Sequence, residues 1–138
     1  METIASLKIA SDLENLASIR SFIDKASKEI GLSDEALSEI RLAVDEACSN
    51  IMIHGYKDSN GELEIVVDRG ETSMVVTLSD NAPTFNPLQA SDHPDFGSPL
   101  EERPLGGMGV FLVKQNTDTV EYRATPSGGN ALILTKNF

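Results

Sequence analysis

Residues 45–55 read DEACSNIMIHG, and this stretch of sequence decides the fold. Apolar residues recur at helical spacing here and in the residues before it, which predicts a helix from near Ser33 to about residues 54–55. Glu46 and Asn50 lie four residues apart, so they share one face of this helix, about 100° from its apolar stripe. His54 continues the same row. The stripe itself comprises Leu37, Ile40, Val44, Ala47 and Ile51.

The row of Glu46, Asn50 and His54 has two interpretations. An amphipathic helix normally turns polar residues toward solvent, and the spacing alone favours this explanation. Asn50 weakens it, because asparagine is a poor helix former inside a helix and its amide oxygen can ligate a hard cation. Glu46, one turn earlier, could serve as a general base for a substrate hydroxyl. Taken alone, the row leaves both interpretations open.

The rest of the chain predicts a regular order of elements. They are a strand at residues 3–10, a helix from a capping box at Ser11 and Glu14 to Gly31, the helix described above, strands at 63–68 and 74–78, a short helix at 110–116, and strands at 120–124 and 131–135. This order predicts an α+β fold, a two-layer sandwich with helices on one face of a mixed, largely antiparallel sheet. Without repeats or linkers, residues 1–138 are expected to form one domain.

The composition narrows the class of protein. Hydrophobic residues make up 40% and charged residues 24%, as in soluble globular domains. A net charge of -11 argues against direct binding to nucleic acid or to anionic lipid. No signal peptide or membrane-spanning run is evident, and the single cysteine, Cys48, forms no internal disulfide. We therefore expect a soluble cytoplasmic protein without membrane attachment.

A second polar motif, residues 80–83 (DNAP), follows directly after an apolar strand. A carboxylate at the end of a strand, here Asp80, can accept a hydrogen bond from a ligand amine beside a dry wall. An Asp-initiated turn before proline is the ordinary alternative. By itself the motif therefore indicates little.

A third motif, Gly106-Gly107-Met108-Gly109, leads into the expected short helix. Glycines let phosphates approach the backbone, and free amides at a helix start favour an anion. No P-loop pattern is present, and a flexible hinge explains the tetrapeptide equally well.

Residues 81–109 between these motifs are expected to form a long loop of the kind that acts as a lid. The loop contains Asp95-Phe96-Gly97, a tripeptide that holds magnesium in eukaryotic-type protein kinases. The chain lacks the other parts of such a kinase, including His-Arg-Asp and G-x-G-x-x-G. The tripeptide is therefore interpreted as ordinary loop.

Together and in this order, the three motifs resemble those of the GHKL ATPases, whose ATP site is the Bergerat fold. Within that group the chain is most similar to the small serine kinases that act as bacterial anti-sigma factors. The resemblance extends over the whole chain. The Glu46/Asn50 row with the following His54-Gly55-Tyr56 matches the N box, residues 80–83 the first glycine box, and residues 106–109 the second.

The resemblance implies a binding site for ATP and Mg²⁺. The residue matching Asn50 ligates the magnesium on the ATP phosphates, and the one matching Glu46 is the general base. The one matching Asp80 accepts from the adenine amine, which excludes GTP because guanine has a carbonyl there. Residues 106–109 would close over the phosphates.

Two departures from the family pattern bear on this site. Ala82 stands where the first glycine box has glycine, so a methyl group is expected beside the adenine and binding could be weaker. No motif fixes a basic phosphate partner. Arg103 and Lys114 flank the glycines as candidates, although an ordinary surface charge explains both.

The implied function is that of an ATP-binding anti-sigma regulatory factor, a protein serine kinase acting on a STAS-type anti-anti-sigma partner and sequestering a sigma factor. Family members commonly dimerise, and Arg20 is a candidate partner contact. The alternative is a non-catalytic ATP/ADP-sensing module: Glu46 favours the kinase and Ala82 the sensor. A histidine-kinase fragment is disfavoured, because no phosphoacceptor helices precede the fold.

Overall fold

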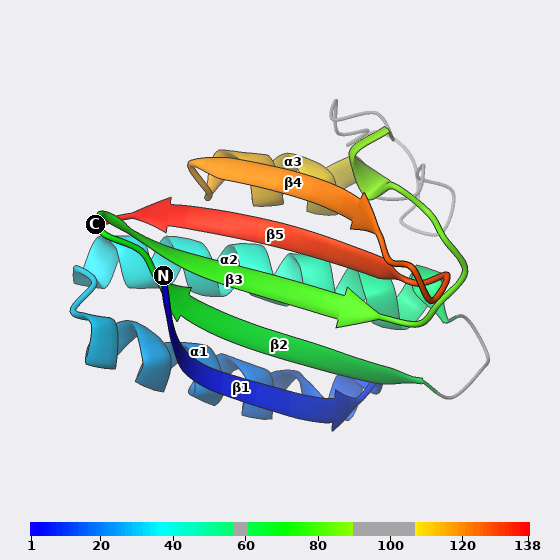
Figure 1. Cartoon of the computed structure of the whole chain (residues 1–138), viewed down its shortest axis with the longest axis horizontal. Helices are drawn as coiled ribbons and strands as arrows, with labels where there is room; N and C mark the ends of the chain where they lie inside the picture. Colours follow the sequence, from blue (N-terminus) through cyan, green and yellow to red (C-terminus); the bar gives the residue numbers. More distant parts are fainter. Residues whose placement is uncertain (57–60, 90–106) are drawn as a thin grey trace.

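Five strands form one sheet, and the helices cover one of its faces (Figure 1). The computed structural model describes residues 1–56, 61–89 and 107–138. Its elements are β1 (Glu2–Ala10), a 3₁₀ turn η1 (Leu13–Asn15), α1 (Leu16–Ile30), α2 (Asp34–Asn50), a π-helical turn η2 (Ile51–Gly55), β2 (Glu62–Arg69), β3 (Ser73–Asp80), a 3₁₀ turn η3 (Pro87–Gln89), α3 (Gly107–Gln115), β4 (Thr119–Ala124) and β5 (Asn130–Asn137).

The strand order is β1-β2-β3-β5-β4, and every described pairing is antiparallel. We expected a mixed, largely antiparallel sheet. No parallel pair is described, because β2 lies between β1 and β3 and β5 lies between β3 and β4, which separates the strands that run in the same direction. The α+β class and the single helical layer are confirmed.

Alternate residues of the central strands face the helices and are buried. In β2 they are Leu63, Ile65 and Val67, and in β3 they are Met74, Val76 and Leu78. The apolar stripes of α1 and α2 pack against them, and full burial of each such side chain stabilises the fold by about 1.5–3 kcal/mol. This layer fixes the direction of α2 across the sheet.

The ends of the first two helices follow the sequence signals with one exception. Gly31 ends α1 in the left-handed conformation (φ 94°), and Ser33 caps α2 by accepting a hydrogen bond from the Ala36 N–H (3.1 Å). The predicted Ser11 capping box is wrong. The Ser11 N–H donates to the Gly61 carbonyl (2.8 Å), which holds Ser11 at the end of the sheet, and Asp12 caps η1 instead.

Two helix boundaries near the expected motifs can be compared with the prediction. The helix through residues 45–55 ends at Gly55, as predicted, but continues beyond Asn50 as the π-helical turn η2. The predicted start of the short helix at Val110 is wrong, because α3 begins at Gly107. None of the helices in the described part of the chain is long and apolar enough to span a membrane.

Candidate functional site

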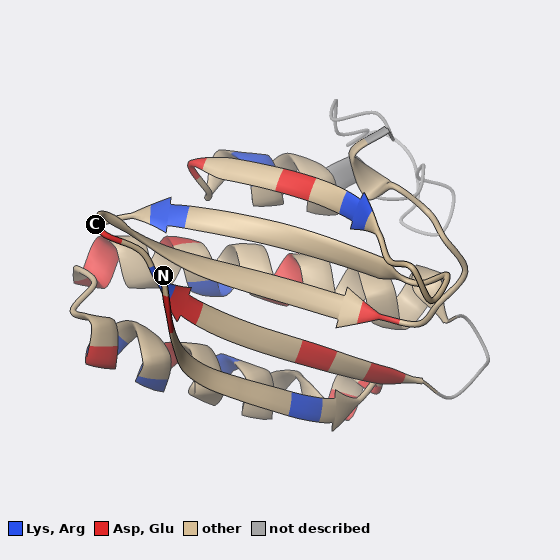
Figure 2. Ribbon diagram, in the orientation of Figure 1, with Lys and Arg blue, Asp and Glu red and all other residues tan. Residues whose placement is uncertain are grey.

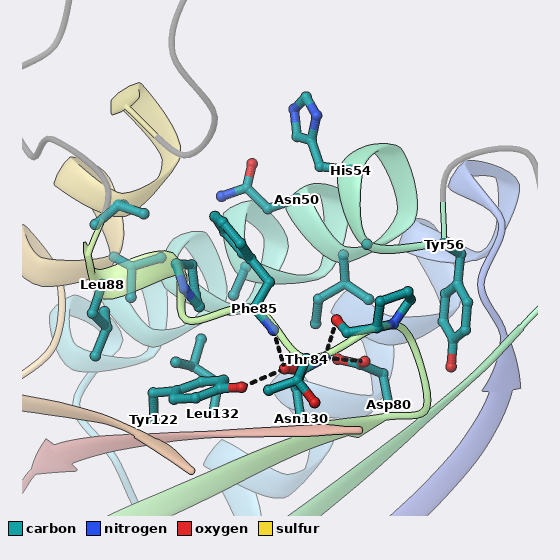
Figure 3. A pocket seen from close by; sticks show the side chains of 17 residues that line it. Asn50, His54, Tyr56, Asp80, Thr84, Phe85, Leu88, Tyr122, Asn130 and Leu132 are labelled. Carbon is teal, nitrogen blue, oxygen red and sulfur yellow. Dashed lines mark hydrogen bonds between the residues drawn. The ribbon is translucent and has the colours of Figure 1, made fainter. Parts of the chain in front are cut away.

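A cavity of about 490 Å³ opens between α2, α3 and the strand ends (Figure 3). Its lining is mostly apolar, with a few polar side chains directed into it, which is the usual composition of a small-molecule site. Asn50 and His54 lie on the helical side, and Asp80 lies on the sheet side. The apolar lining includes Ile51, Phe85, Leu88, Val110, Val113 and Leu132.

Asp80 ends β3, and its side chain is held on one oxygen only. Oδ1 accepts hydrogen bonds from the Ala82 N–H and from Asn130 Nδ2, both at 2.9 Å. Oδ2 makes no hydrogen bond with any residue in the described part of the chain. Asp80 is also the only acidic or basic residue of β3, which is tan up to its red tip in Figure 2.

The electrostatic setting of Asp80 follows from this position. The residue is only 6% exposed, and burial raises the pKa of its carboxyl. The hydrogen bonds from Asn130 and the Ala82 amide act in the opposite direction, because they favour the charged form. A buried carboxylate with one free oxygen is suited to accept a hydrogen bond from a ligand.

Asn130, the first residue of β5, was not identified from the sequence. Besides its bond to Asp80, its Oδ1 accepts from the Tyr122 hydroxyl (2.6 Å) and from the Phe85 N–H (2.9 Å) (Figure 3). Asp80 and Asn130 are direct cross-strand partners in the β3–β5 register. This pairing joins residues 50 positions apart, so no local sequence pattern could have indicated it.

Asn50 lies opposite this network, against the start of α3. A Cβ atom at Gly109 would come within 2.6 Å of Asn50 Nδ2, so a side chain there would displace the Asn50 amide. Gly109 is buried, and it brings the first turn of α3 to the Asn50 side of the cavity. The cavity thus has a helix N-terminus and an amide side chain near each other at one end.

Comparison with known proteins places this chain in a family. Residues 9–136 match the model of the histidine kinase-like ATPase domain. The chain belongs to this ATPase family. It is 30% identical over 118 residues to the serine-protein kinase RsbW of Bacillus mycoides (strain KBAB4), covering 83% of this chain and 74% of the relative. Serine-protein kinases RsbW from Bacillus cereus (strain AH820) and Bacillus anthracis (strain CDC 684 / NRRL 3495) match equally.

A solved structure supports the same fold. The chain matches the RsbU and RsbW domains of a Mycobacterium tuberculosis protein with a TM-score of 0.65 and 16% identity, over 97% of this chain. It spans only 32% of that longer solved chain. An ATPase domain implies ATP binding, and the described cavity offers a site of suitable character.

Glu46, the expected base of this ATPase domain, lies one turn before Asn50 on α2. It is partly exposed and is not among the residues that line the cavity. Burial, and to a lesser extent repulsion by Asp45, raise the pKa of Glu46. The structure therefore brings Asn50, His54 and Asp80 to one cavity and places Glu46 beside it.

Ala82 is not among the residues that line the cavity. Ala82 is buried, and a side chain at Gly55 would contact its Cβ atom. The turn after Asp80 is also held by Tyr56, whose hydroxyl accepts from the Asn81 N–H (2.8 Å) and donates to the Glu62 carbonyl (2.8 Å). The backbone of the turn after Asp80 is thus held from two sides, by Tyr56 and by Asn130.

The remaining expected site residues are placed only in part. Gly107 and Met108 begin α3, whereas Gly106, Arg103 and the tripeptide at 95–97 lie outside the described residues. Lys114 is on α3 but does not line the cavity. Arg20 forms an ion pair with Asp45, with Nε 2.7 Å from Oδ1.

The residues at the Asn50 end of the cavity suit magnesium carried by a nucleotide. Within residues 1–56, 61–89 and 107–138, no group of three His, Cys, Asp or Glu side chains could hold a metal ion. Magnesium that binds with a nucleotide takes most of its ligands from phosphates and water and needs one or two oxygens from the protein. Asn50 can supply one, so the site fits a metal that enters together with ATP.

Proposed function

We propose that this chain is an ATP-dependent protein serine kinase that phosphorylates a STAS-type anti-anti-sigma protein and sequesters a sigma factor. The relatives at 30% identity are named serine-protein kinases, which supports the reaction. The observation that carries nucleotide binding is the free Oδ2 of buried Asp80 at the wall of an apolar cavity that Asn50 also lines. An adenine fits this combination of an apolar slot and one buried acceptor.

In this proposal the adenine amine donates to Asp80 Oδ2. GTP presents a carbonyl oxygen at the same place, so two acceptors would face each other without a proton between them. A buried acceptor left without a donor costs more than an imperfect apolar contact. Asp80 thus provides both affinity for ATP and rejection of GTP.

The triphosphate is proposed to lie at the Asn50 end of the cavity. Asn50 would hold the magnesium that binds with ATP, and the metal supplies neutralisation of the phosphate charge. The amides of Gly107 and Gly109 at the start of α3 favour an anion there. Residues 81–109, with Gly106 and Met108, are proposed to act as the lid over the nucleotide. Positioning and charge neutralisation account for most of the rate in phosphoryl transfer.

Glu46 is proposed as the general base for the partner's serine hydroxyl. Its raised pKa brings the carboxylate closer to the working pH, which improves a base. It lies one helical turn from Asn50, so it would be near the γ-phosphate end of the nucleotide. The attacking hydroxyl comes from the partner protein, and Glu46 is partly exposed, as contact with a partner requires.

The partner surface is proposed to be complementary in charge. At a net charge of -11, the chain favours partners with basic faces, and the half-exposed Arg20 beside Asp45 is a candidate contact. We further propose that residues 1–138 form a single cytoplasmic domain that dimerises and regulates transcription through its protein partners, without contacting nucleic acid or membrane.

One observation favours a second function. Because Glu46 does not line the cavity, a nucleotide bound there would have no general base in contact with it. A non-catalytic module, whose affinity for its partner changes between ATP and ADP, needs a nucleotide site but no general base.

The two functions separate in one experiment. Proteins that co-purify with the chain, with and without ATP, are identified by mass spectrometry, and a recovered STAS protein is then incubated with the chain and Mg-ATP. The kinase proposal predicts phosphoserine on the partner, loss of transfer in Glu46→Ala with nucleotide binding retained, and normal transfer in Glu35→Ala, an exposed site on the same helix. Nucleotide-dependent partner affinity without a phosphoprotein would establish the sensor instead.

A further inference from the structure

The side chain of Asn130 joins three parts of the cavity wall. It contacts Asp80 on β3, Tyr122 on β4 and the backbone of Phe85 in the segment after β3 (Figure 3). It is only 9% exposed, so these contacts take place away from solvent. We propose that Asn130 is a positioning residue that sets the base specificity of the cavity by orienting Asp80, which rests on the ATP-binding function proposed above.

The orientation of the Asn130 amide is determined by its partners. A backbone N–H can only donate, so the Phe85 N–H requires the amide oxygen, Oδ1, on its side. The nitrogen, Nδ2, must then face Asp80 Oδ1. An amide is usually free to be flipped in either sense, but here only one sense satisfies both neighbours.

This fixed amide selects which oxygen of Asp80 meets a ligand. Nδ2 and the Ala82 N–H both donate to Oδ1, which leaves Oδ2 as the acceptor available to a base. Without Nδ2, the Ala82 N–H would remain as the donor to Oδ1, so one hydrogen bond instead of two would fix the position of the second oxygen. Asn130 also lines the cavity, and in this proposal it acts on the base by holding Asp80 in place.

Asn130 also holds the segment that follows Asp80. Nδ2 lies 3.2 Å from the Ala82 carbonyl and 3.3 Å from the Pro83 carbonyl. The same amide therefore fixes the carboxylate and the turn that carries Phe85 into the cavity lining. The Asn130 side chain therefore fixes the distance between the acceptor, Asp80, and the apolar wall that includes Phe85.

The backbone beside Asn130 is built for this close approach. A Cβ atom at Gly129 would overlap the Asp80 carbonyl oxygen, so glycine is needed for the ends of β3 and β5 to meet as they do. A residue that only completed the β4–β5 hairpin would not require contact with both a buried carboxylate and the cavity wall. The arrangement points to a role in the site.

A comparison of ATP with inosine triphosphate tests this role without any protein partner. Inosine carries a carbonyl in place of the adenine amine, so in the pose proposed for adenine it presents an acceptor instead of a donor to Asp80 Oδ2. Dissociation constants for both nucleotides are measured by calorimetry on the wild type, Asn130→Ala, Asp80→Asn and the double variant. We expect Asn130→Ala to weaken ATP about tenfold, to leave inosine triphosphate nearly unchanged, and to add little in the Asp80→Asn background.

Ser127→Ala, an exposed change on the same hairpin, is the matched control and should retain the full ATP preference. Equal weakening of both nucleotides in Asn130→Ala would assign Asn130 a merely structural role and overturn the inference. A wild type that binds ATP no better than inosine triphosphate would overturn the assignment of Asp80 to the adenine amine and the inference with it. If it binds neither nucleotide, the proposed function itself fails.

If Asn130→Ala does not fold, NMR measurements on the Asn130 side chain of the wild type test the inference instead. The NMR signals of the Asn130 amide can be assigned through Tyr122→Phe, which removes the hydroxyl that donates to it. ATP should shift these signals clearly more than inosine triphosphate does. Equal shifts would contradict the inference.

Discussion

The two walls of the cavity differ in how far they are organised before a ligand binds. On the sheet side, Asp80, Asn130 and Tyr122 form a connected network whose hydrogen bonds are 2.6–2.9 Å long. On the helical side, the side chains of Asn50 and His54 make no hydrogen bond with any residue that the structure describes. The base end is therefore rigid, whereas the proposed phosphate end has polar groups available for a ligand.

This difference matches the two tasks of a nucleotide site. Discrimination between bases depends on a fixed acceptor, because a mobile one could turn to suit either base. Phosphate and metal contacts depend on charge and tolerate adjustment, and a metal that arrives with the nucleotide completes its own coordination. Variants on the two walls should therefore fail in different ways.

The largest effect is expected at the sheet wall from Asp80→Asn. The asparagine amide would present either a donor or a neutral acceptor in place of the carboxylate oxygen. The affinity for ATP should therefore fall about 100-fold, and the affinity for GTP should rise relative to that for ATP. Competition binding with both nucleotides measures this change. An unchanged ATP affinity would contradict the role of the whole sheet wall.

Gly129→Ala tests whether the sheet wall depends on the approach of β3 and β5. The added methyl overlaps the Asp80 carbonyl oxygen, so the strand ends must separate, at a cost of about 1–3 kcal/mol in folding free energy and with weaker ATP binding. Denaturant unfolding and calorimetry give both quantities. Gly128→Asn, where no atom lies within 4 Å of the added Cβ, is the control and should retain ATP binding even though φ is 89°.

Gly109→Ala probes the helical wall. The methyl would displace the Asn50 amide, a flexible side chain, so the folding free energy should change little. ATP affinity measured with Mg²⁺ should fall several-fold, by roughly 1 kcal/mol, and less in the presence of EDTA. The preference for ATP over GTP should persist. Loss of that preference would show that the two walls are not independent.

The smallest effect concerns Glu46, beside the helical wall. Its folded-state pKa is raised above the ordinary 4.5, so its stabilising effect is full below the unfolded pKa and is lost as pH rises through the folded pKa. Glu46→Gln should therefore unfold at a slightly higher temperature than the wild type at about pH 7, with the gain disappearing near about pH 4. Thermal unfolding across this range checks it, and a gain that grows toward acid would contradict the raised pKa.

Much of the fold could be predicted because its signals are local. The helical spacing through residues 45–55, the Gly31 stop and the Ser33 cap each depend on a few neighbouring residues. The capping box at Ser11 failed because a distant carbonyl, that of Gly61, engages the Ser11 amide. The early start of α3 was missed for a similar reason, since Gly109 in its first turn packs against Asn50, a residue distant in sequence.

The candidate site divides in the same way. Asn50 and Asp80 could be found because each lies in a short motif at the end of its element. Asn130 and Tyr122 could not, because their role arises from the order β3-β5-β4, which joins strands that are distant in sequence. The position of Glu46 outside the cavity lining also required the structure, since spacing alone puts it on the face of Asn50.

A crystal structure of the chain with Mg²⁺ and a non-hydrolysable ATP analogue tests the central claim most directly. We expect the adenine amine at about 3 Å from Asp80 Oδ2, Asn130 still bonded to Oδ1, and the metal and phosphates between Asn50 and the start of α3. A nucleotide bound elsewhere, or an adenine that turns its amine away from Asp80, would contradict the account.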